Sequence, residues 1–299
     1  MSDTLPNVKI IYRNVLEDEI NFDRFGPIFL TNYSGFGSPE NEVSSQKLFG
    51  VPGQRKTSSS RTYRDMTIGV AIKESSFEEL KSQEHKIMAV INPELAGTIL
   101  ININDNLYSI DVEVLKGYES NSATGASSSS ATLQFRALDP DWRDENQSNK
   151  AIVLTGTKKK MKFPLAITSG FAFATIKPGE IVTVENKGDF AVGFEMKLKI
   201  NAPVVNPRIY NVLTQEYFGW NMSLNAGDEI YLSTVRLKKR TWLTDDVNPE
   251  PTNIMGKRIP GSSFFVLDNL SANNLVIQAD TGIDNILGTL LFTQLIIGV

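Results

Sequence analysis

The stretch that most constrains the fold is 61–114, because its hydrophobic period changes from two to about 3.6 residues and back again. Apolar side chains first alternate with polar or small ones, which predicts a half-buried strand. These alternating positions are Met66, Ile68, Val70 and Ile72. Ser75 or Ser76 then favours a helix start, with Glu78 or Glu79 three residues later to complete a capping box.

The predicted helix has an apolar face that must be covered. Its apolar positions at helical spacing are Phe77, Leu80, Met88 and Ile91. The polar positions expected to point away are Glu79, Lys81, Gln83 and Lys86. Pro93 disfavours a helical residue before it, so the helix is predicted to stop at Asn92. A single amphipathic helix can bury its face only against a sheet, so we expect this unit to be the core of a first domain.

A β-hairpin is predicted directly after Gly97. Alternation returns at Ile99, Ile101 and Ile103, and again at Tyr108, Ile110, Val112 and Val114. Between the two runs, Asp105-Asn106 is predicted to form the tight turn. A further strand is predicted over 132–138, as an antiparallel neighbour of the second hairpin strand.

Two stretches have the composition of exposed connections. Residues 51–60 contain proline, glycine and a serine run, and 118–130 are polar and of low complexity. Such segments bury too little apolar surface to form a core. Taken by themselves, both are predicted to be loops.

The chain is predicted to be mainly β and to form two domains, which suits its length of 299 residues. Residues 1–142 form the first, a β-sandwich or sheet with one α-helix, and 139–150 form the boundary. Residues 151–299 have turn residues at roughly 8–12-residue spacing, which predicts an antiparallel β-sandwich. Its predicted strands are 152–154, 162–167, 170–176, 181–185, 190–200, 208–212, 217–224, 229–233, 236–243, 263–267, 274–279 and 288–297.

Several short motifs occur in a recognisable order along nearly the whole chain. They are Gly35-Phe36-Gly37-Ser38-Pro39-Glu40, Asn92-Pro93-x-x-x-Gly97, Leu138-Asp139-Pro140-Asp141-Trp142, Phe163-Pro164, Asn186-Lys187-Gly188-Asp189, Asn206-Pro207-Arg208-Ile209 and Gly298-Val299. In this order the chain resembles the distal tail protein (Dit) family of siphophages, the siphovirus-type tail component. Residues 270–274 depart from the family, which more often has a Pro-Gly-x-Asn turn there.

The resemblance implies a structural hub at the tip of a phage tail. In the family, the N-terminal domains close a hexameric ring around a channel through which DNA passes, and the C-terminal domain is a galectin-like β-sandwich. The ring joins the tail tube protein to the tail-associated fibre or lysin protein, and in some relatives it carries receptor-binding proteins. The resemblance further implies that 51–60 belong to an extended hairpin that embraces the next subunit. The expected location is the virion, after assembly in the host cytoplasm.

The start of the long strand carries the candidate subunit contacts. A charged, tyrosine-bearing extended segment that leaves a loop is typical of segments that add to a partner's sheet. The candidate contact residues are Arg55, Lys56, Arg61, Tyr63, Arg64 and Met66.

No catalytic, metal or cofactor site is predicted, and the chain is expected not to be an enzyme. There is no cysteine, and His85, the only histidine, lies mid-helix, where we expect it to be exposed or at the edge of the apolar face. No Gly-x-Ser-x-Gly nucleophile turn is present. The formal charge of −4 gives no general affinity for polyanions, and no segment is apolar for the roughly 20 residues of a membrane span.

Two basic runs allow two interpretations. Residues 158–162 and 236–240 each carry four Lys or Arg, which can bind phosphates or can simply form the solvated face or edge of a strand. We favour the solvated strand. The alternative function from another class is a carbohydrate-binding module of a phage tail or surface protein. A third alternative is a hub of a contractile tail or tail-like particle, which would assemble from copies of itself in the same way.

Overall fold

The computed structural model describes residues 8–23, 26–121, 127–154, 156–159, 174–177, 179–245 and 249–299. The chain divides into two compact units. The first comprises Met1–Asn146 and Leu295–Val299, and the second comprises Gln147–Gln294. The last five residues, which the sequence prediction placed in the second domain, therefore lie with the first unit.

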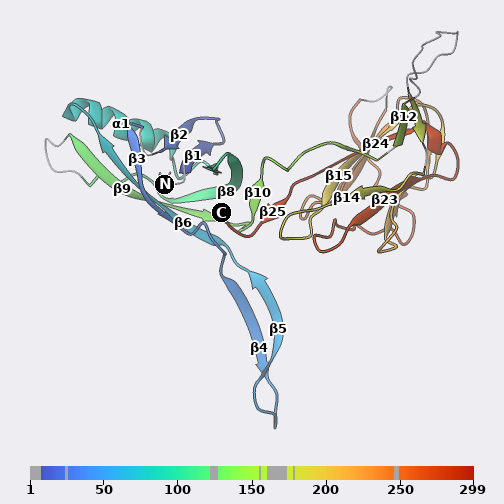
Figure 1. Ribbon diagram of the computed structural model, residues 1–299, viewed down its shortest axis with the longest axis horizontal. Coiled ribbons are helices and arrows are strands. Elements are labelled where there is room, and N and C mark those ends of the chain that lie inside the picture. The colour runs from blue at the N-terminus through green and yellow to red at the C-terminus, as the bar shows by residue number, and fades with distance from the viewer. Residues whose placement is uncertain are drawn as a thin grey trace, which may run out of the picture. The chain divides into compact units, whose positions relative to one another are not determined.

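The first unit is built on one antiparallel sheet with the strand order β2-β1-β7-β8-β9-β6-β3 (Figure 1). A short strand, β10, pairs with both β8 and β25. The strands are β1 (Val8–Asn14), β2 (Glu19–Phe22), β3 (Ile28–Ser34), β6 (Arg64–Lys73), β7 (Gly97–Ile103), β8 (Asn106–Lys116), β9 (Ser128–Ala137), β10 (Trp142–Asp144) and β25 (Leu295–Ile296). The predicted pairing of the 108–114 and 132–138 strands is confirmed by β8 and β9.

The helix α1 (Phe77–Val90) packs against β2, β6 and β9. Its N-cap is Ser76, whose side chain accepts a hydrogen bond from the backbone N–H of Glu79, as the capping motif predicted. The buried face comprises Leu80, Glu84, Ile87 and Val90. The predicted apolar face is therefore partly wrong, because Phe77 and Met88 are exposed while the carboxylate of Glu84 is buried.

The β7–β8 hairpin has the predicted strands but a different turn. Ile103 pairs with Asn106, so the two loop residues are Asn104 and Asp105. Their φ angles of 50° and 66° are left-handed, as a two-residue hairpin turn that matches the twist of the strands requires. The predicted turn was thus one residue too late.

A second hairpin, β4 (Asn41–Lys47) and β5 (Gln54–Arg61), extends from the first unit beside β6 (Figure 1). The sequence-based interpretation of 51–60 as a loop is wrong, and the hairpin implied by the family resemblance is present. Seven residue pairs hold the two strands together, with an irregularity at Ser44/Ser45.

The second unit is a β-sandwich of a six-stranded sheet, β11-β24-β15-β20-β21-β22, and a four-stranded sheet, β14-β23-β17-β18. The strands are β11 (Ile152–Val153), β14 (Val182–Val184), β15 (Phe194–Ile200), β17 (Arg208–Asn211), β18 (Tyr217–Gly219), β20 (Glu229–Ser233), β21 (Arg240–Thr244), β22 (Thr252–Asn253), β23 (Asn273–Gln278) and β24 (Ile286–Phe292). Two further pairs are β12 (Gly156–Lys159) with β13 (Ala174–Lys177), and β16 (Val204–Val205) with β19 (Ser223–Leu224). The main-chain architecture confirms the predicted fold class.

The inner faces of these sheets form the core of the second unit. Its buried side chains include Phe194, Met196, Leu198, Ile209, Phe218, Trp220, Leu275, Ile277 and Leu290. Two single-turn helices, η1 (Met255–Lys257) and η2 (Ile283–Asn285), complete the described elements. None of the helices in the described part of the chain has the length and apolar character of a membrane span.

Several predicted strands of the second unit are shorter, absent or split. The 263–267 segment forms only a single bridge at Leu267, and 236–239 form a turn rather than the start of a strand. The predicted 288–297 strand ends at Phe292 as β24, and β25 continues in the first unit. The predicted strand at 162–167 and part of the basic run at 158–162 lie outside the described residues.

Candidate assembly surfaces

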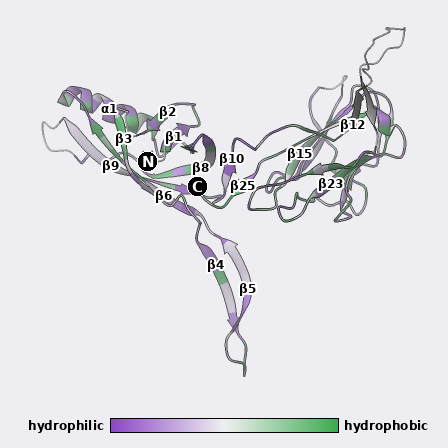
Figure 2. Ribbon diagram, in the orientation of Figure 1, coloured by the Kyte–Doolittle hydropathy of each residue, from purple (hydrophilic) through white to green (hydrophobic). Residues whose placement is uncertain are grey.

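The β4–β5 hairpin is the most exposed element of the first unit. Every residue of β4 is exposed, and so is every residue of β5 except Arg61, which is half-buried. Both strands are mostly hydrophilic (Figure 2). The loop between them is not, because Leu48, Phe49 and Val51 are exposed there and Phe49 has 106 % relative exposure. An isolated two-stranded hairpin is marginally stable in water, so an apolar tip on such an arm is an interaction feature.

The base of the hairpin is braced by ion pairs to the sheet. The guanidinium of Arg61 donates to Asp141 at 2.7 Å. Arg136 forms a bidentate pair with Asp65, at 2.7 and 2.9 Å, and lies 3.9 Å from the ring centre of Tyr63. This hydrogen bond from Arg136 lowers the pKa of the Asp65 carboxyl. The candidate residues Arg61 and Tyr63 therefore lie at the ion-paired base of the hairpin, and Arg55 and Lys56 lie on its exposed strand β5.

Arg64 and Met66 do not belong to this exposed surface. Met66 is fully buried, and Arg64 is only 3 % exposed. Arg64 donates hydrogen bonds to the carbonyls of Pro140 (2.9 Å), Gly35 (2.9 Å) and Ile297 (2.7 Å), and also to that of Gly37. Burial lowers the pKa of Arg64 despite the nearby charge of Asp141. The structure does not support these two residues as subunit contacts, because they hold the first unit together.

Arg64 is the centre of a small hydrogen-bonded cluster that includes the end of the chain. Ile296 pairs with Trp142, and the backbone N–H of Val299 donates to the carbonyl of Phe36 at 3.1 Å. The indole N–H of Trp142 donates to the same carbonyl at 3.2 Å. Three distant parts of the sequence are thereby joined at the root of the β4–β5 hairpin.

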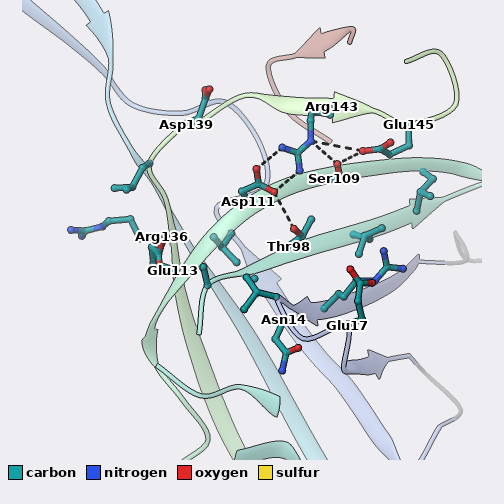
Figure 3. A pocket seen from close by; sticks show the side chains of 18 residues that line it. Asn14, Glu17, Thr98, Ser109, Asp111, Glu113, Arg136, Asp139, Arg143 and Glu145 are labelled. Carbon is teal, nitrogen blue, oxygen red and sulfur yellow. Dashed lines mark hydrogen bonds and ion pairs between the residues drawn. The ribbon is translucent and has the colours of Figure 1, made fainter. Parts of the chain in front are cut away.

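A concave polar surface lies on the outer face of β7, β8 and β9 beside β10, with a cavity volume of about 780 Å³ (Figure 3). Arg143 pairs with both carboxylate oxygens of Asp111 at 2.6 Å and donates to Ser109 at 2.9 Å. Thr98 donates to Asp111 at 3.0 Å. The Arg143 guanidinium and the Asp111 carboxylate therefore neutralise each other within this cavity.

The sequence analysis did not identify this surface, because its residues come from separate strands and share no local motif. Leu138 and Val15 on its rim are exposed apolar side chains. His85 is exposed on the helix, as expected. Within the described ranges, no group of three or more His, Asp or Glu residues is placed to hold a metal ion.

Charge is distributed unevenly between the two units. The first unit carries 21 Asp and Glu against 14 Lys and Arg, whereas the second carries 13 against 16. The first unit is therefore strongly acidic, and the chain's small total charge conceals this difference. A surface of this sign repels a polyanion such as DNA.

Comparison with known proteins relates most of the first unit to a known family of domains. Residues 17–135 match the family model of the phage tail protein RIFT-related domain. No curated protein matches the sequence significantly.

Two solved structures share the fold across nearly the whole chain. The SPP1 Dit protein (gp 19.1), described as a paradigm of the hub of the adsorption apparatus in phages that infect Gram-positive bacteria, aligns with a TM-score of 0.66 and 10% identity. That alignment covers 96% of this chain and 98% of the other. A chain of the phage P2 baseplate, in its activated conformation with Ca, aligns with a TM-score of 0.53 and 10% identity, covering 97% and 98%. Residues 17–135 of this protein are therefore similar to the phage tail protein RIFT-related domain, and nearly the whole chain shares the fold of the SPP1 Dit protein.

Proposed function

We propose that this protein is a structural hub of a phage tail tip, which forms a hexameric ring. The ring joins the tail tube protein to a tail-associated fibre or lysin protein, with receptor-binding proteins as further partners. It acts in the virion after assembly in the host cytoplasm, and it catalyses no reaction.

The observation that carries this proposal is the β4–β5 hairpin with its apolar tip. Burying one phenylalanine side chain contributes about 1.5–3 kcal/mol, so insertion of Phe49 into a neighbouring subunit is a substantial anchor. Because the hairpin and its receiving surface differ, the contact is heterologous, and such contacts close into rings when the rotation permits. Repetition around the ring adds avidity to each modest contact.

The acidic first unit supports the passage of DNA through the ring. A channel that conducts DNA must not retain it, and cationic linings bind phosphates strongly. An excess of seven acidic over basic residues in the unit that matches the tail-protein family suits a lumen that repels the genome.

The test is the mass of the purified protein in light scattering, combined with electron microscopy. The wild type is expected to form a ring of six 33.1 kDa subunits. Phe49→Ser is expected to yield monomers that retain the wild-type unfolding temperature. Leu270→Ser is the matched control, because Leu270 is also a strongly exposed apolar residue (89 %) but belongs to the second unit. A Phe49→Ser ring of unchanged mass would refute the role of the tip.

The carbohydrate-binding alternative makes a different prediction for the second unit. If saccharide binding were the protein's main function, the wild type would stay monomeric under all conditions and bind glycans tightly. A ring in electron microscopy excludes that alternative as the primary function.

A further inference from the structure

The basic run 236–240 has a structure that the proposed hub function does not use. It forms the exposed turn between β20 and β21, and Leu237 at its tip is 92 % exposed with a left-handed φ of 63°. Arg236, Lys238, Lys239 and Arg240 are all exposed. No carboxylate in the described ranges lies within ion-pairing distance of these four side chains, so their charge is available to a ligand.

Aromatic rings lie beside these cations. Arg240 lies 4.5 Å from the ring centre of Trp242, which stacks on Tyr231 at 4.5 Å with an interplanar angle of 15°. Lys239 lies 5.6 Å from the ring centre of Phe264. Cations that rest on aromatic faces keep their outward N–H groups for other acceptors.

The outer face of the six-stranded sheet continues from this turn. Cross-strand register aligns Lys197, Tyr231, Trp242 and Asn253 in one row across β15, β20, β21 and β22. Lys197 pairs with Glu229 at 3.4 Å. Burial raises the pKa of the Tyr231 hydroxyl, and the neighbouring Glu195 carboxylate raises it further while Arg240 lowers it. The row therefore presents one indole among amide, ammonium and carboxylate groups.

We infer that this face, with the 236–240 turn, binds an anionic saccharide. Sugar hydroxyls suit a surface of mixed carboxylate, amide and ammonium groups, because each hydroxyl both donates and accepts hydrogen bonds. The turn supplies the charges that neutralise carboxylate or phosphate substituents. The inference concerns the second unit and does not depend on ring formation.

Nucleic acid fits this face less well. Base stacking needs an open aromatic face, but Trp242 is stacked on Tyr231 and contacted by Arg240. Glu195 and Glu229 on the same face can accept hydrogen bonds from sugar hydroxyls, which every unit of an acidic saccharide carries beside its anionic group. The phosphodiester backbone of DNA offers no such hydroxyl donors, so these carboxylates favour the saccharide.

Calorimetric titration of the full-length protein with oligogalacturonate tests the inference. Polyphosphate, neutral malto-oligosaccharides and single-stranded oligo(dT) are the comparison probes. The wild type is expected to bind oligogalacturonate more tightly than any of them. The triple variant R236Q/K238Q/K239Q should lose affinity about tenfold or more, because three cations close to the ligand are removed.

A matched control removes three exposed lysines elsewhere, in the variant K73Q/K86Q/K187Q, and should change affinity less than about twofold because distant surface charges are screened. Trp242→Leu should weaken the saccharide but leave polyphosphate binding unchanged, with thermal unfolding as the check on folding. Equal losses in both triple variants overturn the inference. So do an absence of oligogalacturonate binding and equal or tighter binding of polyphosphate or oligo(dT).

Discussion

Replacing Arg64 by methionine is predicted to destabilise the first unit strongly. The guanidinium is buried and donates to the carbonyls of Pro140, Gly35 and Ile297 at 2.7–2.9 Å. A hydrogen bond to a charged group contributes about 1.5–3 kcal/mol, and each buried carbonyl left without its donor costs about 1–3 kcal/mol. Because packing by methionine and local relaxation recover part of this, we expect a loss of about 4 kcal/mol in the free energy of unfolding, in the range for breaking buried ionic groups.

Differential scanning calorimetry measures this effect unit by unit. For a domain of about 150 residues, 1 kcal/mol shifts Tm by roughly 2–4 °C, so Arg64→Met should lower the first unit's transition by about 10 °C. The transition of the second unit should not move, because Arg64 has no partner there among the described residues. Arg64→Lys should recover only part of the loss, since a point charge cannot donate in several fixed directions.

Arg13→Met provides the matched control. Arg13 also forms an ion pair, with Glu19, but its side chain is 41% exposed. Solvent screening limits such a pair to less than about 1 kcal/mol. If Arg64→Met lowers the Tm of the first unit no more than Arg13→Met does, the structural role of the hydrogen-bonded cluster around Arg64 is refuted. That result would also return Arg64 to the candidates for subunit contact.

Three further predictions concern groups that are packed in the first unit. Burial, reinforced by the charge of Glu113, raises the pKa of Tyr12 from 10.0 to about 12. The folded state thus disfavours tyrosinate, stability falls as pH rises from 10 to 12, and Tyr12→Phe should lose about 2 kcal/mol less over that range in urea unfolding. Burial raises the pKa of Glu84, but hydrogen bonds from Lys81 and from serine side chains outweigh it and leave the pKa below its usual value. The ionised Glu84 carboxylate therefore stabilises the fold at pH values above its unfolded-state pKa, and this stabilisation is lost as pH falls through its folded-state pKa. In the same urea-unfolding assay, Glu84→Gln should therefore lose less free energy of unfolding on acidification than the wild type. A Cβ at Gly298 would lie 2.7 Å from the backbone of Gly37, so Gly298→Ala should lower the first unit's calorimetric transition by several degrees; an unchanged transition would show that the chain end is not packed there.

The six candidate contact residues include both exposed and buried side chains, which local sequence pattern does not distinguish. Charge reversal of Arg61 and Arg64 together would also break the hydrogen bonds by which Arg64 holds the first unit together. Loss of mass in light scattering would then report unfolding rather than disassembly. The hairpin tip is the better target, because its side chains have no packing role within the subunit.

Local periodicity determined the elements that have one buried and one exposed face. Ile99 and Ile101 on β7, and Leu133 and Phe135 on β9, are fully buried as their alternation predicted. Capping chemistry within four residues placed the helix start at Ser75 or Ser76, and Ser76 is the N-cap. These features depend only on neighbours along the chain, so the sequence alone determined them, together with the mainly β fold class.

Tertiary structure alone decided the features that depend on partners far away in the chain. The pairing of β25 with β10, which returns the chain end to the first unit, and the burial of Arg64 join segments up to 233 residues apart. Glu84 is buried because Ser120 and Lys81 satisfy its carboxylate, which its place among polar helix residues did not indicate. The β4–β5 hairpin lacked a hydrophobic period because neither of its faces packs on the subunit's own core, so no alternation was needed to form it.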